Sequence, residues 1–217
     1  MADSDGTLLH REWTIWYDKR AAPGKRRGAA DNYESNLQPI GSFGTVEEFW
    51  RLYSFIRRPL DIDNANYHVF KSGIKPMWED PANKNGGKWV VNVGNDAALN
   101  CFWENLLLAL IGETVDPHDE VCGCVLSRRK YGDKIAVWNK SKNDRQAILD
   151  LGRRIQDALS DGLVVKADSG DSAEMAPLPL LALEYQHHED SLRTGASYTT
   201  QARISLRESH SRSSGIK

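Results

Sequence analysis

Short runs typical of β-strands make up most of this chain, and three longer runs between them are typical of helices. Short turns join several of the strand runs, and the tripeptide KYG after Arg129 suits a β-hairpin. Because short turns connect neighbouring antiparallel strands, the pattern predicts a mostly antiparallel sheet of about eight strands. The strand patterns cover residues 13–17, 37–43, 67–71, 87–93, 120–129, 133–139 and 180–188.

The three helical patterns cover residues 46–56, 96–111 and 143–160. Thr45 and Glu48 form a capping box at the start of the first helix, which should end before Pro59. The second helix has Gly112 at its C-cap position. Helices that interrupt an antiparallel order indicate an α+β fold: a single curved sheet with three helices that cover one face. The other face is then left for a ligand.

The chain has 217 residues, which is enough for one domain with a sizeable core. We expect a flexible N-terminus at residues 1–10, one domain at residues 11–206 and a disordered polar tail at residues 207–217. Within the domain, residues 21–32 read as a basic, flexible loop. Residues 167–177 read as a mobile polar insertion.

Composition restricts the class of protein. The formal net charge of −2 and the pI near 6.3 argue against a broad polyanion-binding surface. The sequence has no signal-peptide pattern and no apolar run long enough for a membrane span, which favours a cytosolic or nuclear protein. Cys101, Cys122 and Cys124 are expected to be reduced thiols, and their spacing does not indicate a metal site.

The chain contains seven tryptophans, and one of them lies in a loop beside a carboxylate. Trp78 and Glu79 stand among Pro, Asn and Gly residues, which are typical of a loop. A second aromatic residue, Tyr33, occupies another polar loop. A single loop tryptophan is most often an anchor for its loop. Two rings on separate loops at one end of a sheet, however, can hold a flat ligand ring between them.

A carboxylate beside a stacking ring is suited to read guanine. The edge of guanine presents two adjacent N–H donors, which Glu79 can accept as charge-assisted hydrogen bonds. A positively charged N7-methyl guanine would add cation–π attraction to the two rings. Basic residues near this loop can hold phosphates, although a solvated turn would carry the same residues. They are Lys88 and, around the hairpin turn, Arg128, Arg129, Lys130 and Lys134.

Five segments resemble the eukaryotic translation initiation factor 4E family, the messenger-RNA cap-binding proteins. They read TVEEFWRLYSFI, FKSGIKPMWEDPANKNGGKW, FWENLLLALIGE, VCGCVLSRRKYGDKIAVWNK and EYQHHEDS, in the family's order across about residues 11–206. The resemblance implies a cupped antiparallel sheet with three helices on its convex face, in agreement with the pattern above. It also implies a cap-binding domain without a cofactor, whose ligand is N7-methyl-GTP or capped messenger RNA.

The resemblance assigns roles to single residues of a cap site. Trp78 and Tyr33 correspond to the two stacking rings, Glu79 to the residue that reads guanine, and Trp138 to a residue against the N7-methyl group. Tyr33 stands where the general initiation factor has Trp, and this departure resembles the class II branch, the 4E homologous protein. The loop at Arg193 is one residue shorter than the main family form. Four basic residues would hold the phosphates: Arg129 and Lys134, with Lys88 and Arg193 as further phosphate-side positions.

The resemblance implies a second site, on the back of the sheet, for a helical segment of a scaffold or inhibitor protein. The helical period gives some independent support, because Leu108 falls outside the apolar stripe of its helix. Beside Trp50, an exposed Leu108 would begin an apolar groove. The positions that map to this site are Val46, Trp50, Leu107, Leu108 and Gly112.

Three interpretations of the function follow. The first is a monomeric, non-enzymatic cap-binding protein that links capped messenger RNA to partner proteins, either in translation initiation or as a class II type repressor that competes with the general factor. The second is an enzyme that processes the cap or a guanine nucleotide, although the loops supply basic residues and no carboxylate cluster for metals. The third is a protein-interaction scaffold whose cap pocket has decayed. The presence of Trp78, Glu79 and Trp138 argues against this interpretation.

Overall fold

The computed structural model of the protein describes residues 6–19, 33–94, 98–130, 132–161, 164–166, 175–177, 181–194 and 204–206. The basic loop expected at residues 21–32 and the tail expected at residues 207–217 lie outside the described residues. The same holds for residues 167–174 of the insertion.

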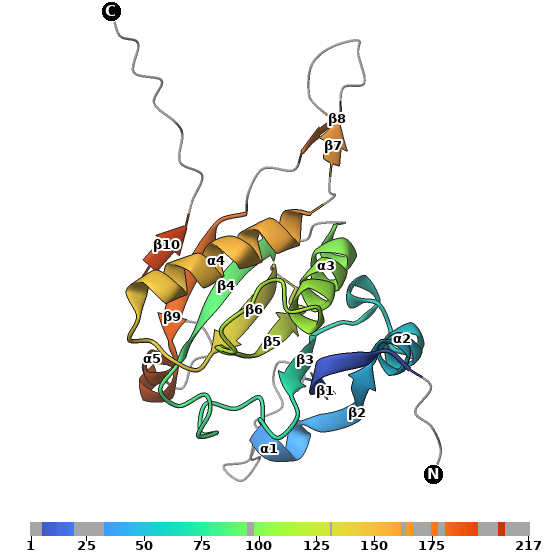
Figure 1. Cartoon of the computed structure of the whole chain (residues 1–217), viewed down its shortest axis with the longest axis horizontal. Coiled ribbons are helices and arrows are strands. Elements are labelled where there is room, and N and C mark those ends of the chain that lie inside the picture. Colours follow the sequence, from blue (N-terminus) through green and yellow to red (C-terminus); the bar gives the residue numbers. More distant parts are fainter. Residues whose placement is uncertain are drawn as a thin grey trace, which may run out of the picture.

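An eight-stranded sheet forms the body of the protein, and its neighbouring strands are antiparallel throughout (Figure 1). The strand order is β10-β9-β4-β6-β5-β3-β1-β2, which confirms the predicted sheet of about eight strands. The strands are β1 (Leu8–Lys19), β2 (Gln38–Thr45), β3 (Ala65–Lys71), β4 (Gly87–Gly94), β5 (Val121–Ser127), β6 (Asp133–Asn139), β9 (Leu183–His187) and β10 (Ile204–Leu206).

The three longer helices pack on one face of this sheet. Phe49 of α2, Leu106 of α3 and Ile155 of α4 belong to one buried apolar cluster with strand side chains such as Trp89. Figure 1 shows α3 and α4 across the sheet and α2 near its β1–β2 edge. We call this the helix-covered face and the other the open face. The helical segments are α1 (Tyr33–Asn36), α2 (Val46–Phe55), the short 3-10 helix η1 (Pro59–Asp61), α3 (Leu99–Ile111), α4 (Arg145–Ser160) and α5 (His188–Thr194).

Local sequence signals set the start of α2 and the edge of the sheet. The Glu48 backbone N–H donates to Thr45 Oγ1 at 3.1 Å, and the Thr45 N–H donates to the Glu48 carboxylate at 3.2 Å, which confirms the capping box. The helix ends at Phe55, before Pro59, as predicted. Pro39 lies in β2, an edge strand of the sheet, where proline is tolerated.

The N-terminal prediction needs correction, because β1 begins at Leu8, inside the segment 1–10 that the sequence predicts to be flexible. The Thr7 carbonyl accepts the backbone N–H of Val46 at 2.9 Å, and the Thr7 N–H donates to the Glu47 carboxylate at 2.8 Å. These bonds hold the approach to β1 against the first turn of α2. The sequence pattern misses them because they join residues about forty positions apart.

The insertion and the two shortest α-helices also differ from expectation. Residues 175–177, which the sequence places in a mobile insertion, form β8 (Met175–Pro177) and pair with β7 (Val164–Lys166) in a separate antiparallel ladder. The sequence pattern does not predict the helices α1 and α5. Their 4 and 7 residues are too few to show a helical period.

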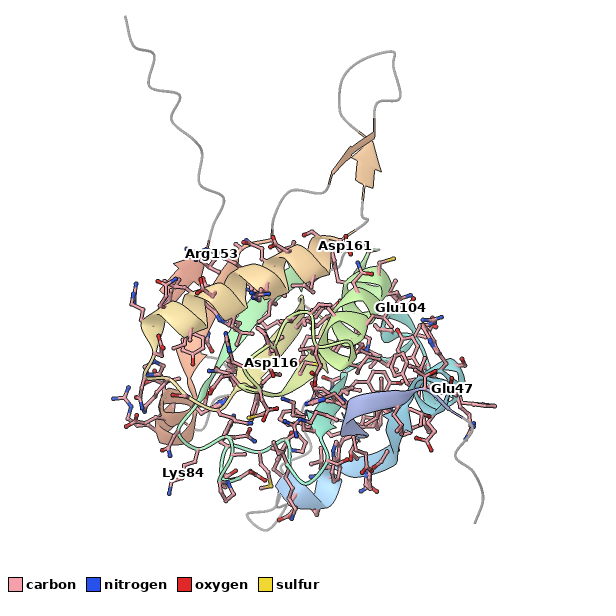
Figure 2. The ribbon with its side chains drawn as sticks, viewed as in Figure 1. Glu47, Lys84, Glu104, Asp116, Arg153 and Asp161 are labelled. Carbon is pink, nitrogen blue, oxygen red and sulfur yellow. The ribbon has the colours of Figure 1, made fainter. Side chains whose placement is uncertain are left out.

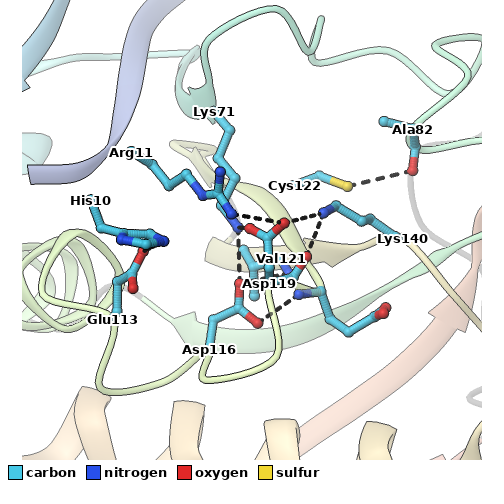
Figure 3. A network of polar contacts seen from close by, with 11 residues as sticks. His10, Arg11, Lys71, Ala82, Glu113, Asp116, Asp119, Val121, Cys122 and Lys140 are labelled. Carbon is cyan, nitrogen blue, oxygen red and sulfur yellow. Dashed lines mark hydrogen bonds and ion pairs between the residues drawn. The ribbon is translucent and has the colours of Figure 1, made fainter.

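A network of charged side chains ties β1, β3 and the residue that follows β6 to the loop between α3 and β5 (Figure 3). Lys71 Nζ lies 3.0 Å from the Asp116 carboxylate and 2.7 Å from that of Asp119. Lys140 and Arg11 reach Asp119 at 2.8 and 3.3 Å. Burial opposes ionisation of Asp119, but hydrogen bonds from Lys140 and Lys71 hold its pKa below its ordinary value. The positive charge of the nearly buried Lys71 is therefore neutralised by two carboxylates of the same loop, those of Asp116 and Asp119.

Gly152 shows that packing can override helix propensity in α4. A Cβ atom at this position would lie 2.6 Å from two atoms of the Trp89 ring and 2.7 Å from a Leu206 methyl group. The ring cannot easily give way, because Trp89 Nε1 donates to the Ile148 carbonyl at 3.0 Å. Gly152 is thus the residue that lets α4 approach the sheet.

We predict that Gly152→Ala lowers the free energy of unfolding. Alanine is favoured over glycine in a helix by about 1 kcal/mol, but overpacking costs roughly 1–3 kcal/mol, so a net loss of up to about 2 kcal/mol is expected. Urea unfolding followed by circular dichroism measures this. Arg153→Ala, on the exposed side of the same helix, is the control and should change stability by less than about 0.5 kcal/mol. A more stable Gly152→Ala variant would show that the space is larger than the structure indicates.

Candidate functional site

The open face of the sheet combines polar side chains with a small apolar cluster. Side chains alternate along each strand, so that Tyr67 and Val69 of β3 enter the main core while Asn66, His68 and Phe70 face the other way. Ile74, Trp78 and Ala82, which follow β3, pack over this second cluster. Its buried members are Phe70, Val90, Cys122, Val125, Ala136 and Trp138.

Strand register divides the open face into two ends. Trp138 of β6 is paired with Lys88 of β4, and we call this position the ring end. Lys134 of β6 is paired with Ser127 of β5, close to Arg129, and we call this position the basic end. Four residues of a strand separate the two rows, which corresponds to roughly 13 Å.

The loop that carries Trp78 and Glu79 is held by two buried or half-buried polar side chains. The Asn83 side-chain amide donates to the carbonyls of Lys75 and Met77, each at 2.8 Å. The carboxylate of Asp80 accepts the backbone N–H groups of Lys75 and Ala82, each at 2.9 Å. Figure 2 labels Lys84 at the end of this loop. The backbone around Trp78 is therefore fixed from inside the loop.

Trp78 and Glu79 point in different ways from this fixed loop. Trp78 is half-buried and packs against the apolar cluster of the open face, whereas Glu79 is exposed. The ring is thus braced on one side, and the carboxylate next to it is left in solvent. The structure keeps this predicted pair together at the ring end.

Tyr33 lies on the element that meets the Trp78 loop. It begins α1 and is the first residue that the structure describes after residue 19. The next residue, Glu34, forms an ion pair with Lys75 of the Trp78 loop. The structure therefore brings the Tyr33 segment and the Trp78 loop to the same end of the sheet, as predicted. Figure 1 shows α1 beside this loop.

Trp138 and Lys88 form the floor of the ring end. Trp138 is 7% exposed, and its ring lies edge-on to Phe70 with centroids 5.4 Å apart. Lys88 is 1% exposed, and its Nζ lies 6.0 Å from the Trp78 ring centroid and 5.8 Å from that of Trp138. Burial, with a smaller effect of the Lys134 charge, lowers the pKa of Lys88 to about 7. The structure thus places Lys88, which the resemblance maps to a phosphate-side position, close to both indoles.

His188 is a member of the ring end that the sequence did not indicate. Its ring lies 4.3 Å from that of Trp138 at an angle of 45°. Burial, together with the charge of Lys88, lowers the pKa of His188 to about 3, so the imidazole is neutral. Ser191, three residues along α5, accepts from Lys88 Nζ at 3.4 Å. The short helix α5 thus closes the ring end from one side.

The basic end is built around Asp133 at the start of β6. One oxygen of this buried carboxylate accepts the Arg129 backbone N–H at 3.0 Å, and the other pairs with the Arg128 guanidinium. Arg128 is therefore a structural partner of Asp133. The half-buried Arg129 and Lys134 remain as the basic side chains of the site, and burial lowers the pKa of Lys134.

Arg193 lies on a different element from these two basic residues. It is in the last turn of α5, which begins where the His188 N–H donates to the Gly86 carbonyl at 3.2 Å, just before β4. Its exposed side chain lies 3.7 Å from the Asp190 carboxylate. Because α5 starts at the ring end, the structure does not group Arg193 with Arg129 and Lys134 on the hairpin.

Four of the five predicted partner-site residues are accessible on the helix-covered side. Trp50 of α2 and Leu108 of α3 are each 39% exposed, Gly112 is exposed at the end of α3, and Val46 is half-buried at the start of α2. Glu47 and Glu104 mark these two helices in Figure 2. Leu107 needs correction: it is 1% exposed and packs in the main core. A step of one residue along a helix turns a side chain by about 100°, which separates Leu107 from Leu108.

Together, the fold and the open face define a class: an α+β protein whose antiparallel sheet is covered by helices on one face and carries aromatic and basic side chains on the other. A sequence model of eukaryotic initiation factor 4E matches residues 8–203. The chain belongs to the eukaryotic initiation factor 4E family. Within the described ranges, no helix is long and apolar enough to cross a membrane.

Similar sequences come from plants. The eukaryotic translation initiation factor NCBP of Triticum aestivum is 38% identical over 192 residues, which is 88% of this chain and 73% of the relative. The isoform 4E-2 of Oryza sativa subsp. japonica is 42% identical over 147 residues, 67% of this chain and 69% of the relative. NCBP is a class II-like homologue, in agreement with the resemblance that Tyr33 indicated.

Two solved structures share the fold. The first is the complex of Caenorhabditis elegans eIF4E-3 with the 4E-binding protein Mextli and a cap analog, with 30% identity and a TM-score of 0.72. The match covers 93% of this chain and 99% of the eIF4E-3 chain. The second is the complex of Ascaris suum eIF4E-3 with the m7G cap, with 27% identity and the same TM-score, 0.72. This match covers 94% of this chain and 99% of the Ascaris suum eIF4E-3 chain.

The sequence indicates the Trp78–Glu79 pair and the basic residues of the hairpin. It does not indicate Asn83 and His188, which support the site. Asn83 stands in the quoted loop, but Asn is common in loops and gives no sign that its amide is buried. His188 lies at a strand end with no period to mark it. Asn83 acts through contacts within its own loop, and His188 through contacts to distant segments, and neither kind of contact follows a regular period.

We predict that Asn83→Ala loosens the Trp78 loop. The change leaves the carbonyls of Lys75 and Met77 without their donor and should lower the free energy of unfolding by about 1–3 kcal/mol. In the variant, native-state hydrogen exchange of the backbone amides of residues 75–84 should be faster than in the parent. Exchange of the amides of the main sheet should change less. The control is Asn85→Ala, an exposed site in the same loop whose backbone carbonyl makes the contact to Lys142. Unchanged exchange in the Asn83 variant would contradict the proposed brace.

Proposed function

We propose that the protein binds the 7-methylguanosine cap of messenger RNA on the open face of its sheet. The observation that carries this proposal is the Trp78–Glu79 pair on an internally braced loop that packs against the cluster of Trp138. Arg129 and Lys134 lie at the other end of the same face, and four residues of β6, roughly 13 Å, separate Lys134 from Trp138. A ring-binding end and a phosphate-binding end at this separation suit a nucleoside with a 5′ phosphate chain.

The chemistry of the ring end fits N7-methylguanine. Trp78 and Tyr33 stack on the two faces of the base, and the positive charge of the methylated ring adds cation–π attraction. Glu79 accepts the two adjacent N–H donors of the guanine edge. Trp138 lies against the N7-methyl group. The ligand is N7-methyl-GTP or capped messenger RNA, and no cofactor is required.

The buried Lys88 is compatible with a cationic ligand ring. A lysine whose pKa is about 7 carries only part of a charge at neutral pH, so that it repels a methylated base less than an ordinary lysine would. Further along the face, Arg129 and Lys134 attract the phosphates, Arg129 through a planar fork and Lys134 as a point charge. Arg193 is a further phosphate-side residue only if the phosphate chain bends towards α5.

Relatives support this function over an enzymatic one. The related eIF4E-3 structures contain a cap analog or the m7G cap, and the family consists of cap-binding factors and not of enzymes. The role follows in two forms: the protein links capped messenger RNA to partner proteins in translation initiation, or it acts as a class II type repressor that competes with the general factor. We propose a monomer that works in the cytoplasm and also in the nucleus.

The helix-covered side serves as the partner surface in this proposal. Trp50 of α2 and Leu108 of α3 are exposed apolar side chains on the helix-covered side, and exposed apolar side chains are what an amphipathic partner helix recognises. A related eIF4E-3 forms a complex with the 4E-binding protein Mextli. The partner of this chain is therefore a scaffold or inhibitor protein that presents a helical 4E-binding motif.

We predict that N7-methyl-GTP binds and quenches tryptophan fluorescence, whereas GTP binds far more weakly, because GTP lacks the charged ring. Trp78→Ala should lower the affinity for N7-methyl-GTP by roughly 5- to 150-fold, since stacking contributes roughly 1–3 kcal/mol per base. Glu79→Gln should weaken binding too, because an amide presents one acceptor oxygen to two donors. Fluorescence titration at fixed salt measures all three. Equal affinity for the two nucleotides would rule out cap recognition.

We predict that Trp50→Ala removes binding of a helical peptide with a 4E-binding motif and leaves N7-methyl-GTP affinity within about twofold. A buried tryptophan anchor at an interface is worth about 2 kcal/mol or more. Calorimetry with the peptide and fluorescence with the nucleotide separate the two sites. Phe55→Ala, which is 88% exposed on the same helix and outside the mapped surface, is the control. Comparable losses for both ligands in folded Trp50→Ala would show that Trp50 is a core residue.

A further inference from the structure

Arg129 is oriented by contacts on the protein side of its guanidinium. Its Nη1 donates to the carbonyls of Ala65 at 3.1 Å and Arg128 at 2.6 Å. Its Nη2 donates to the side-chain oxygen of Asn66 at 2.7 Å. The Asn66 contact is the only one of these three that depends on how a side chain is turned.

The orientation of the Asn66 side chain is set by a carboxylate behind it. Its Nδ2 donates to both oxygens of Asp18, at 2.9 and 2.7 Å. An ionised carboxylate only accepts hydrogen bonds, so it selects the NH₂ end of the amide and leaves the oxygen end towards Arg129. Without that carboxylate the amide could turn over, and its NH₂ group would then face the guanidinium.

Asp18 is itself buried and held. Asp18 and His68 are each 2% exposed, and His68 Nε2 lies 2.7 Å from the Asp18 carboxylate. Burial alone would raise the pKa of Asp18, but the hydrogen bond and charge of His68, followed by Asn66 and the Arg129 charge, hold it below its ordinary value. The carboxylate is therefore ionised at neutral pH, as an acceptor-only group must be.

Strand register places this chain of contacts at the basic end. Asp18 of β1 is paired with Asn66 of β3, Asn66 with Ser127 of β5, and Ser127 with Lys134 of β6. One row across four neighbouring strands thus runs from the buried carboxylate to the lysine of the basic end. The row does not include Trp138, which lies roughly 13 Å away along β6.

We propose that Asp18 is a positioning residue for phosphate binding, which acts through the Asn66 amide to set the orientation of the Arg129 guanidinium. His68 fixes the carboxylate from the other side. The inference rests on the proposed cap-binding function and assigns to two buried strand residues a role in holding the 5′ phosphates. The effect belongs to the phosphates and not to the base.

Electrostatics and positioning predict opposite signs, which makes the test sharp. Removal of a negative charge near the phosphates should strengthen their binding if only the long-range field matters. Positioning predicts the reverse, because the new amide in the Asp18→Asn variant could accept or donate and would no longer fix the Asn66 amide. The affinities of N7-methyl-GTP and of the nucleoside 7-methylguanosine, which has no phosphate, separate the phosphate effect from the ring effect.

We expect Asp18→Asn to lower N7-methyl-GTP affinity about tenfold, the scale of one hydrogen bond to a charged group, and to leave 7-methylguanosine affinity unchanged. Asn66→Ala tests the same link and should show the same selective loss. The double variant Asp18→Asn/Asn66→Asp keeps one carboxylate and one amide in the pair and an acceptor towards Arg129. It should restore N7-methyl-GTP affinity to within about threefold of the parent.

Asp119→Asn is the control, since it removes a carboxylate that is paired with lysines away from this row (Figure 3). It should leave the ratio of the two affinities at the parent value. Equal losses for both ligands in Asp18→Asn and Asn66→Ala, or tighter binding of N7-methyl-GTP, would overturn the positioning role. If the parent itself fails to bind N7-methyl-GTP, the proposed function falls first and the inference falls with it.

Discussion

The register between β6 and its neighbours is the constraint on which the rest of the site depends. Because side chains alternate along a strand, a slip of one residue would turn Trp138 and Lys134 into the main core. Gly123 of β5 is paired with Trp138, and a Cβ atom there would lie 2.4 Å from the Phe70 ring. The missing side chain leaves room for Phe70 to meet Trp138 edge-on. One glycine thus helps to fix both the pairing of β5 with β6 and the floor of the ring end.

The open face has to bind a ligand that carries negative phosphates at one end and a positively charged base at the other. A phosphate chain needs cations, but a cationic base is repelled by them, so the positive charge has to be concentrated at one end. At the basic end, Arg128 is matched by Asp133, whereas Arg129 is held through the neutral amide of Asn66. At the ring end, burial lowers the pKa of Lys88 to about 7 and keeps His188 neutral. The same strands therefore present a strongly basic and a weakly basic region on one surface.

The sequence predicts the parts of this protein that local patterns encode. The capping box at Thr45, the amphipathic helices and the loop chemistry around Trp78 are visible because each is written in neighbouring residues. The Asp18–Asn66 contact joins residues 48 positions apart, and strand pairing alone creates it. The resemblance places Leu107 on the partner surface because it aligns whole segments, whereas a helix exposes Leu108 and buries its neighbour. The resemblance identifies Trp138, but only the fold shows that Lys88 lies beneath it.

The two proposed binding surfaces lie on opposite faces of one sheet, with the main core between them. Phe49 packs below Trp50 and stacks on Tyr53 at 5.3 Å, so the partner side of α2 rests on buried rings. Between Tyr33 and Trp50 the chain runs through β2. This strand begins two residues after α1 and ends at Thr45, the N-cap of α2. Since β2 is an edge strand, it is bonded to the sheet on one side only. Phe43 of β2 packs against Phe49 with ring centroids 5.2 Å apart, so the same edge strand joins the partner side of α2 to the main core.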